Sequence, residues 1–430
     1  MDGVSGITQC AILLNQSFVY TYSTGDQSGT YWYHSHYAIQ YGDGLKDALI
    51  IKDQNDPWKI FYQDEEVLQI TDWYHTSAHT LLRSYLYPGT LDPIPDTALI
   101  NGIGQFNCTL NETCSYYRAS IRAGTTKRYR IINTSVYATM TLTIDQHQIR
   151  LIEADGIYLD GNKYIRALRL SPGQRYSVLV TAKEKFSSSY WIRATIRPFV
   201  DYKTQYDLSI KPNIRAILQY INETDQNIQT TIPSIDSFND DTFIINQSVN
   251  HGKIFSDQLE LVPMNETKYH FPRNGVKKTI FLNSQYKGEK PGYFYLNNET
   301  FVHPTNTSLL SLLLFNNSKE FHLPSAFQVE ADEIIDIVIN NIDFAPDLFH
   351  LHGYHVWILA HGNSNDGYLN QSKLNTIAYN EISPIYRDTF TVNPFSYLVF
   401  RFKTDNPGSW MMHCHNDWHV PLGMAAVLIE

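Results

Sequence analysis

The chain has 430 residues, of which 43% are hydrophobic and 13% aromatic, so it can bury a large apolar core. Its length alone predicts about two to four domains. The formal net charge of −10 argues against nucleic acid as a partner. No run reaches the ~18 apolar residues of a membrane-spanning helix, so we expect no membrane segment in this chain. The longest apolar run, "SLLSLLLF" at 308–315, is interpreted as a core segment.

Short runs rich in Val, Ile, Tyr and Phe recur between turn residues along the whole chain, which is typical of β-strands. Long repeats with helical spacing are scarce. We therefore predict an all-β fold of tandem sandwiches. The predicted strands lie at 48–53, 128–135, 175–182, 216–221, 334–341, 398–404 and 425–430.

Two polar stretches divide the chain, "KDQNDPW" at 52–58 and "NETDQNIQTT" at 222–231. They predict three domains, over 1–60, 61–225 and 226–430. A complete sandwich takes ~100 residues, so the first domain is expected to be incomplete.

Cysteine and asparagine usage favours a secreted or cell-surface protein. Cys108 and Cys114, in "NCTLNETC", have the spacing of a small disulfide loop formed in an oxidising compartment. The chain also carries many Asn-x-Ser/Thr glycosylation sequons, some of them accidental in so Asn-rich a sequence. The start "MDGVSGITQC" contains no signal peptide, so we expect part of the N-terminus to be missing. The sequons lie at Asn15, Asn107, Asn111, Asn133, Asn222, Asn246, Asn265, Asn298, Asn306, Asn316 and Asn370.

The motif His-x-His occurs three times, in "WYHSH", "FHLHG" and "HCH". Side chains alternate faces along a strand, so both imidazoles of a pair share one face. Cys414, between the last two imidazoles, then points to the opposite face. The sequence therefore predicts two metal sites on opposite sides of one strand, one containing a thiolate and one made of histidines. The paired residues are His34 and His36, His350 and His352, and His413 and His415.

Ligand chemistry indicates which metal suits each site. Cys414, His419 and the thioether of Met424 form most of a blue-copper electron-transfer set. A site made only of histidines suits copper that binds oxygen. Zinc is the chemical alternative, but structural zinc sites usually close with four ligands at finger-like spacing, which we do not find in the sequence.

These motifs make the chain resemble the multicopper oxidases, the family of laccases, ascorbate oxidases and ferroxidases. The resemblance runs almost end to end, through "GTYWYHSHYAIQYGDGL", "ALINGIGQFNC", "FHLHG", "RDTF" and "TDNPGSWMMHCHNDWHVPLGM". It implies tandem cupredoxin-like Greek-key β-sandwiches, with a trinuclear copper cluster between the first and third domains. It also implies a laccase-like oxidase that takes single electrons from a phenol, ascorbate or Fe²⁺ and reduces O₂ to water.

The resemblance further implies up to four coppers, in type 1, type 2 and type 3 sites. The implied ligands are His34, His36, His352, His413 and His415 for the type 3 pair, His350 for type 2, and Cys414, His419 and Met424 for type 1. Asp2 and Asp417 match positions where the family has acidic residues near the cluster. They are therefore candidates for proton delivery.

The chain departs from the family pattern in three places. The family has four His-x-His pairs and this chain has three; the missing pair normally precedes the "DG" of "MDGV". Asp347, in "PDLFHLHG", replaces a histidine that binds type 1 copper. A carboxylate is a harder ligand that favours Cu(II), so we expect a lower potential or no stable blue copper. The family's cysteine at the position of Cys10 often pairs with one in a C-terminal tail. We therefore expect truncation after Glu430, which leaves Cys10 without a partner; the alternative is a free buried thiol.

These departures support a second hypothesis, a catalytically impaired or non-enzymatic copper-binding remnant of such an oxidase. The expected partners of the enzyme are a small-molecule reductant and O₂, and the oligomeric state is left open. Five further histidines could be taken for metal ligands but are interpreted as structural or surface residues, namely His75, His79, His147, His355 and His361.

Overall fold

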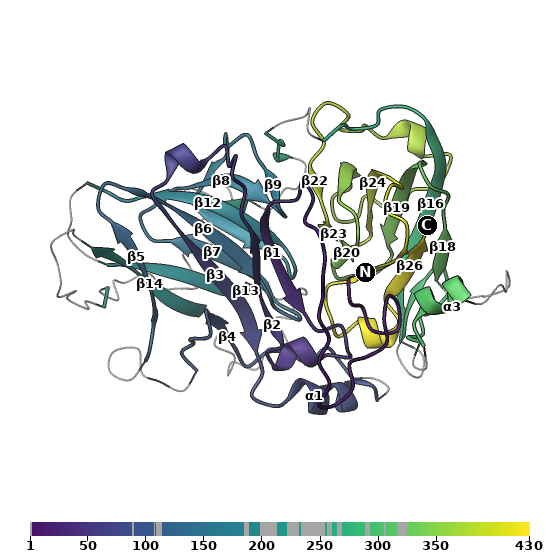
Figure 1. Ribbon diagram of the computed structural model, residues 1–430, viewed down its shortest axis with the longest axis horizontal. Helices are drawn as coiled ribbons and strands as arrows, with labels where there is room; N and C mark the ends of the chain where they lie inside the picture. The colour runs from purple at the N-terminus through teal and green to yellow at the C-terminus, as the bar shows by residue number, and fades with distance from the viewer. Residues whose placement is uncertain are drawn as a thin grey trace.

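The computed structural model shows a chain built almost wholly from β-strands, arranged as sheets that pack face to face (Figure 1). The predicted all-β class is therefore confirmed. The structure describes residues 2–87, 90–106, 108, 114–184, 189–197, 213–221, 232–233, 254–255, 260–264, 269–288, 293–304, 307–315 and 325–430.

The N-terminal part contains a two-stranded antiparallel sheet, β1 (Gly29–His34) and β2 (Lys46–Ile51). The turn between the strands includes the short helix η1 (Gln40–Asp43). The sheet lies against the next sandwich, because the backbone N–H of Thr30 donates to Glu153 Oε1 at 2.6 Å. Glu153 is fully buried and paired with Arg128, so this contact anchors β1 in the interior.

The second unit is a sandwich of two sheets. The strand orders are β10-β8-β12-β6-β3-β4, with β9 beside β8, and β15-β11-β7-β13-β14-β5. The first sheet comprises β3 (Asp64–Trp73), β4 (Thr97–Ile100), β6 (Thr126–Asn133), β8 (Ile149–Ala154), β9 (Ile157–Tyr158), β10 (Tyr164–Ile165) and β12 (Arg175–Thr181). The second comprises β5 (Tyr117–Arg122), β7 (Thr139–Ile144), β11 (Ala167–Leu170), β13 (Tyr190–Arg197), β14 (Asn213–Ile221) and β15 (Ile254–Phe255).

The third unit is a second sandwich. Its sheets have the orders β17-β16-β19-β24-β21-β22 and β18-β26-β25-β20-β23. The first sheet comprises β16 (Val276–Lys287), β17 (Tyr293–Leu296), β19 (Ile334–Asn341), β21 (Val356–His361), β22 (Tyr386–Arg387) and β24 (Ser396–Lys403). The second comprises β18 (Ala326–Gln328), β20 (Asp347–Leu351), β23 (Thr389–Val392), β25 (Ser409–Cys414) and β26 (Ala425–Ile429). The domain boundaries at 60 and 225 stay predictions.

Helices are few and short. They are α1 (Ala78–Tyr85), α3 (Leu309–Phe315), η2 (Lys59–Phe61), η4 (Leu374–Thr376) and η5 (Val420–Leu422). Within the described ranges, none of them has the length and apolar character needed to cross a membrane.

All seven predicted strands overlap observed ones, namely β2, β6, β12, β14, β19, β24 and β26. The interpretation of 308–315 as a core segment is wrong. The run forms α3, in which Leu309 is buried while Leu314 and Phe315 are 69% and 86% exposed. Periodicity cannot classify an unbroken run of Leu, and Leu has high helix propensity.

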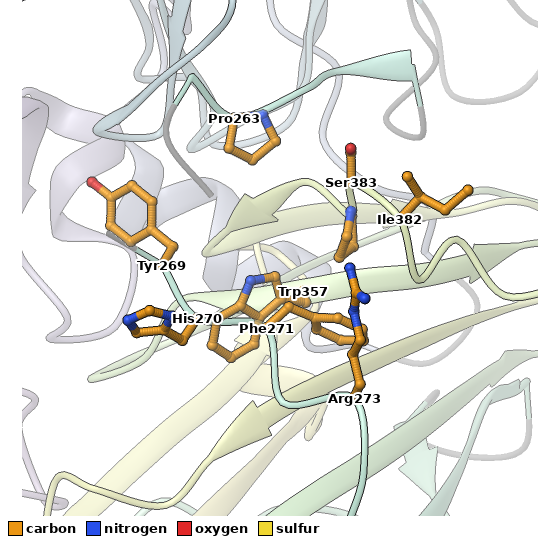
Figure 2. A pocket seen from close by; sticks show the side chains of 9 residues that line it. Pro263, Tyr269, His270, Phe271, Arg273, Trp357, Ile382 and Ser383 are labelled. Atoms are coloured by element: carbon orange, nitrogen blue, oxygen red, sulfur yellow. The ribbon is translucent and has the colours of Figure 1, made fainter. Parts of the chain in front are cut away.

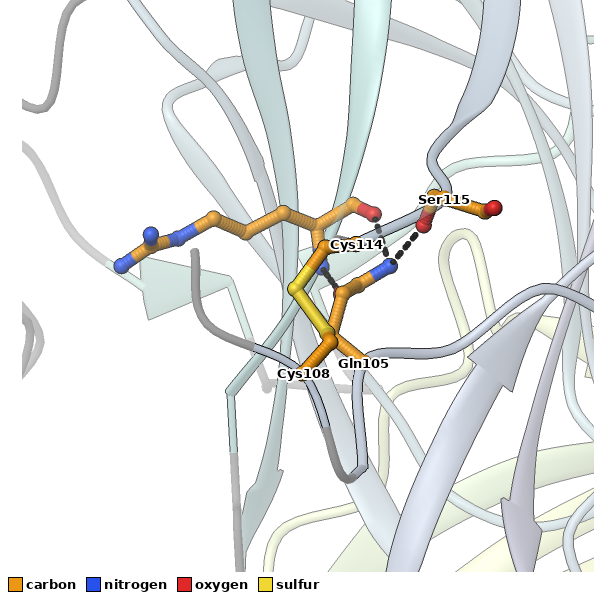
Figure 3. The surroundings of a disulfide bond; sticks show 5 residues. Gln105, Cys108, Cys114 and Ser115 are labelled. Carbon is orange, nitrogen blue, oxygen red and sulfur yellow. Dashed lines mark hydrogen bonds between the residues drawn. A yellow bond between two sulfur atoms is a disulfide. The ribbon is translucent and has the colours of Figure 1, made fainter. Parts of the chain in front are cut away.

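The predicted disulfide between Cys108 and Cys114 is present (Figure 3). The Gln105 side chain lies beside it and donates to the carbonyl oxygens of Ser115 and Arg215, each at 3.1 Å. The Gln105 amide oxygen also accepts from the Arg215 backbone N–H at 2.9 Å. The disulfide loop is therefore tied to β14. Cys10 is a free, exposed thiol.

The sequons differ in whether the fold leaves them accessible. Asn15, Asn298 and Asn370 are exposed. Asn133 is fully buried and its amide donates to two backbone carbonyl oxygens, so it belongs to the accidental sequons. The others fall outside the described residues: Asn107, Asn111, Asn222, Asn246, Asn265, Asn306 and Asn316.

Candidate metal centre

Sheet pairing brings the histidine motifs together. β20 and β25 pair antiparallel, with His350 directly opposite His413. His352 and His415 lie just beyond these strands, and His34 ends β1. Each motif is therefore positioned by a strand whose neighbours fix its register.

The six imidazoles form one cluster. Ring centroids lie 4.5 Å apart for His34 and His36, 4.8 Å for His36 and His352, 4.7 Å for His350 and His352, 5.5 Å for His34 and His415, and 5.5 Å for His413 and His415. The ligand atoms of His36, His352 and His413 all lie within 4.8 Å of one another. Such convergence of nitrogen donors is typical of a metal site.

Burial favours the neutral form of several of these rings. Burial, and then neighbouring imidazoles, hold the pKa of His36 and His413 well below the usual value. Burial likewise lowers the pKa of His350 to about 3 and that of His415 to about 4. Neutral imidazole is the form that binds metals. Moreover, His36 Nε2 and His415 Nδ1 are buried without a hydrogen-bond partner in the described part of the chain. The donor set therefore fits copper.

Side chains behind the cluster fix the orientation of its rings. His350 Nδ1 donates to the carbonyl oxygen of Asp388 at 3.0 Å. His352 Nδ1 lies 2.5 Å from Asp2 Oδ2, and Thr8 donates to the other oxygen of Asp2 at 3.1 Å. Burial alone would raise the pKa of Asp2, but His352 and these hydrogen bonds lower it to about 2. Partners of this kind orient metal-binding imidazoles.

Asp417 is the other candidate for proton delivery. It is buried, and its Oδ2 has no hydrogen-bond partner among the described residues. Burial raises its pKa, while the nearby Lys46 opposes that shift. The charge of Asp417 acts on Tyr41, whose ring lies 4.6 Å from that of His34. Asp2 contacts the cluster directly, through His352.

The thiol of Cys414 faces away from the imidazole cluster. Its Sγ lies 3.5 Å from His419 Nδ1 and accepts a hydrogen bond from the Asn416 backbone at 3.4 Å. The Cys414 backbone N–H donates to the carbonyl oxygen of Met424, which is fully buried. Cys414, His419 and Met424 thus come from one short stretch that begins at the last residue of β25.

Asp347 completes this second group. It is 2% exposed, and its Oδ2 lacks a hydrogen bond within the described residues. Burial, and then the charge of Asp343, raise its pKa well above the usual value. Asp347 in turn adds to the effect of burial in raising the pKa of Cys414. A buried carboxylate with one unpartnered oxygen, close enough to act on a thiol, fits a bound cation, with carboxylate oxygen in place of a third nitrogen.

Sequence reasoning missed Asp92. Its carboxylate lies 3.0 Å from His419 Nε2 and accepts from the Asn416 amide at 2.9 Å and from Tyr85 at 2.7 Å. Burial alone would raise its pKa, but the charge of His419 lowers it. Asp92 and His419 are 327 positions apart, so no local spacing could have linked them.

Two of the histidines set aside from the sequence have partners within the fold. His147 lies 2.7 Å from the hydroxyl of Tyr220 and 2.7 Å from the carbonyl oxygen of Asp145. His355 Nε2 donates to the carbonyl oxygen of Asp155 at 2.8 Å. These contacts favour the structural interpretation.

Three family models, all described as multicopper oxidase, match residues 1–56, 64–223 and 287–430. The chain belongs to the multicopper oxidase family. Among solved structures, this multicopper oxidase is similar to Fet3p, "a multicopper oxidase that functions in iron import", with a TM-score of 0.81 and 28% identity over 100% of this chain and 77% of that one. It is also similar to the laccase from Botrytis aclada, with a TM-score of 0.77 and 25% identity over 100% and 75% of the two chains.

Named relatives fall into two groups. The "iron transport multicopper oxidase fio1" of Schizosaccharomyces pombe is 32% identical over all of this chain and 64% of its own length. Laccase-5 of Trametes villosa is also 32% identical, over 99% of this chain and 75% of its own length. This multicopper oxidase therefore spans about two thirds of the length of its iron-transport relatives.

Proposed function

We propose that this chain is a copper-dependent oxidase whose reductant is Fe²⁺ and whose electron acceptor is O₂, which is reduced to water. The observation that carries the choice of Fe²⁺ is the carboxylate of Asp92 at the outer nitrogen of His419. The Asp92 side chain is 29% exposed, so this edge of the thiol-containing group is open to solvent.

The surroundings of His419 favour a small cation over an aromatic reductant. Phe294 stacks on the imidazole at 4.1 Å and covers its face. A second carboxylate, Asp343, acts electrostatically on the same imidazole. Fe²⁺ accepts carboxylate oxygens as ligands, whereas a phenol needs an apolar pocket. The iron-transport names of several relatives agree with this choice, although a laccase is equally similar.

Copper, when bound, supplies one-electron chemistry on the thiol side and oxygen reduction on the imidazole side. The chain's own residues supply the connection. Cys414 faces His419, while its two sequence neighbours, His413 and His415, belong to the imidazole cluster. Electrons therefore have a short covalent route through Cys414. The carboxylate of Asp2 holds a proton on Nδ1 of His352, at the edge of the cluster.

We also propose that Asp347 gives the thiol site a lower potential, or prevents a stable blue copper. Electron paramagnetic resonance of the copper-loaded protein distinguishes these two outcomes. An ordinary blue-copper spectrum contradicts both. A secreted or cell-surface location is part of the proposal, supported by the Cys108–Cys114 disulfide.

The test combines copper content with oxygen uptake on Fe²⁺, hydroquinone and ascorbate. About four coppers per chain with turnover supports the oxidase, and fewer than three without turnover supports the copper-binding remnant. Asp92→Asn is expected to raise KM for Fe²⁺ about tenfold, the cost of one charged contact, and to change KM for hydroquinone much less. Asp332→Asn removes an exposed carboxylate elsewhere and serves as the control. Equal loss on both reductants in Asp92→Asn contradicts Fe²⁺ binding there.

A further inference from the structure

A pocket lies where the segment after the second sandwich reaches the third. It is lined by Pro263, Tyr269, His270, Phe271, Arg273, Trp357, Ile382, Ser383 and Pro384 (Figure 2). Pro263 is bridged to Leu159 of the second sandwich, and Trp357 belongs to β21. None of the lining residues is a candidate copper ligand. The volume is about 200 Å³, below the range of drug-sized sites and suited to a single substituted ring.

Aromatic side chains form the floor of the pocket. Trp357 is 8% exposed and stacks on Tyr386, with ring centroids 4.4 Å apart and planes at 27°. Phe271 meets Trp357 edge-on at 6.0 Å. Tyr269 packs on Tyr386 at 5.2 Å. A planar ring entering this pocket would exchange water for aromatic contacts, which is the favourable environment for an aromatic ligand.

The segment that carries the rim is held in place by a buried ion pair. Arg401 donates to both carboxylate oxygens of Asp336, at 2.6 and 3.0 Å. Its remaining nitrogen donates to the carbonyl oxygens of Pro272 and Arg273, at 2.9 and 3.2 Å. The Arg401 guanidinium also lies 5.3 Å over the Phe271 ring. The pocket is therefore formed before any ligand arrives, which reduces the ordering cost of binding.

The rim is positively charged. Arg273 is exposed, and its guanidinium makes no hydrogen bond or ion pair with any residue that the structure describes. In Figure 2 its side chain extends beside Phe271 and ends below Ser383. His270 lies on the same rim, and among the residues that the structure describes no acidic side chain lines the pocket. A planar guanidinium fork binds a carboxylate through two parallel hydrogen bonds.

From this geometry we propose that the pocket binds a monocyclic aromatic carboxylate, with its ring on Trp357 and Phe271 and its carboxylate on Arg273. The ring of the ligand would pack on the aromatic floor, and its carboxylate would pair with the Arg273 guanidinium. A neutral sugar would use the aromatic floor but not the charge, so it fits the rim less well. The site is independent of the proposed oxidase activity.

The test is isothermal titration calorimetry of the full, copper-loaded chain with benzoate, benzyl alcohol and acetate. Benzoate has no phenolic hydroxyl to be oxidised, so binding is read without turnover. We expect benzoate to bind at least about tenfold more tightly than benzyl alcohol, which lacks the acid, and than acetate, which lacks the ring. Failure of benzoate to bind overturns the proposal and leaves the oxidase proposal untouched.

Variants locate the binding. Arg273→Gln is expected to weaken benzoate binding about tenfold and to leave benzyl alcohol unchanged, since only the charged contact is lost. Arg273→Lys keeps the charge without the fork and should fall between the two. The control Arg166→Gln removes an exposed arginine of the second sandwich and should have no effect. Benzoate binding that survives Arg273→Gln, or falls equally in Arg166→Gln, overturns the assignment.

Discussion

Replacing Arg175 with Met tests the ion pair that joins the two sandwiches. Arg175, in β12, donates to both oxygens of Asp388 at 2.6 and 2.8 Å, and the two residues are 2% and 6% exposed. Removing one partner of a buried pair costs about 3–5 kcal/mol, because the other charge stays buried without compensation. Thr389 still donates to Asp388 at 2.8 Å, so we expect a loss near the lower end, about 3 kcal/mol of unfolding free energy.

The assay is urea denaturation followed by tryptophan fluorescence. Lys163→Met is the matched control, because Lys163 pairs with Glu260 at 2.7 Å on the surface and its loss should cost at most about 1 kcal/mol. A double-mutant cycle with Asp388→Asn should show that the two losses are not additive. Equal effects of Arg175→Met and Lys163→Met, or additive losses in the cycle, would refute the reasoning.

Three further outcomes are expected. Gly173 has φ +81°, and a Cβ there would lie 2.6 Å from the His415 ring. Gly173→Ala should therefore lower the copper content per chain and leave the circular dichroism spectrum unchanged. Full copper content in this variant would contradict the prediction. The double variant Cys108→Ser/Cys114→Ser should lose about 2 kcal/mol of unfolding free energy in urea denaturation, as expected for so short a loop, and unchanged stability contradicts it. Burial raises the pKa of Asp343 to about 6, so its protonated form stabilises the fold below about pH 4 and that contribution is lost as the pH rises through 6. Stability measured from pH 4 to 7 should therefore fall more steeply in the wild type than in Asp343→Asn, and parallel curves contradict the assignment.

Sequence patterns predicted the features that depend on neighbouring residues, namely the strands and the faces to which their side chains point. Runs of β-branched and aromatic residues became strands, because such side chains fit a pleated, buried surface. The alternation of His413, Cys414 and His415 predicted that the thiol faces away from the two imidazoles. The contact between Cys414 and His419 agrees with this prediction. The helix at 309–315 was missed because an unbroken apolar run carries no period.

Contacts between distant segments lay beyond sequence reasoning. Asp92 comes from the loop between α1 and β4, and it meets His419 only because the second and third units pack together. Asp388 orients His350 from the turn between β22 and β23. The pocket floor depends on the stacking of Trp357 on Tyr386, which belong to different strands. In each case the tertiary fold, and not a sequence motif, brings the residues into contact.

The ladder between β20 and β25 sets Phe349 against Cys414 and His350 against His413. A slip of this ladder by one residue would exchange the two faces of β25, turning sulfur into the imidazole cavity and nitrogen out of it. Main-chain hydrogen bonds thus separate the thiol from the imidazoles before any metal binds. The strand pairing, and not the loops, therefore decides which donor atoms each site receives.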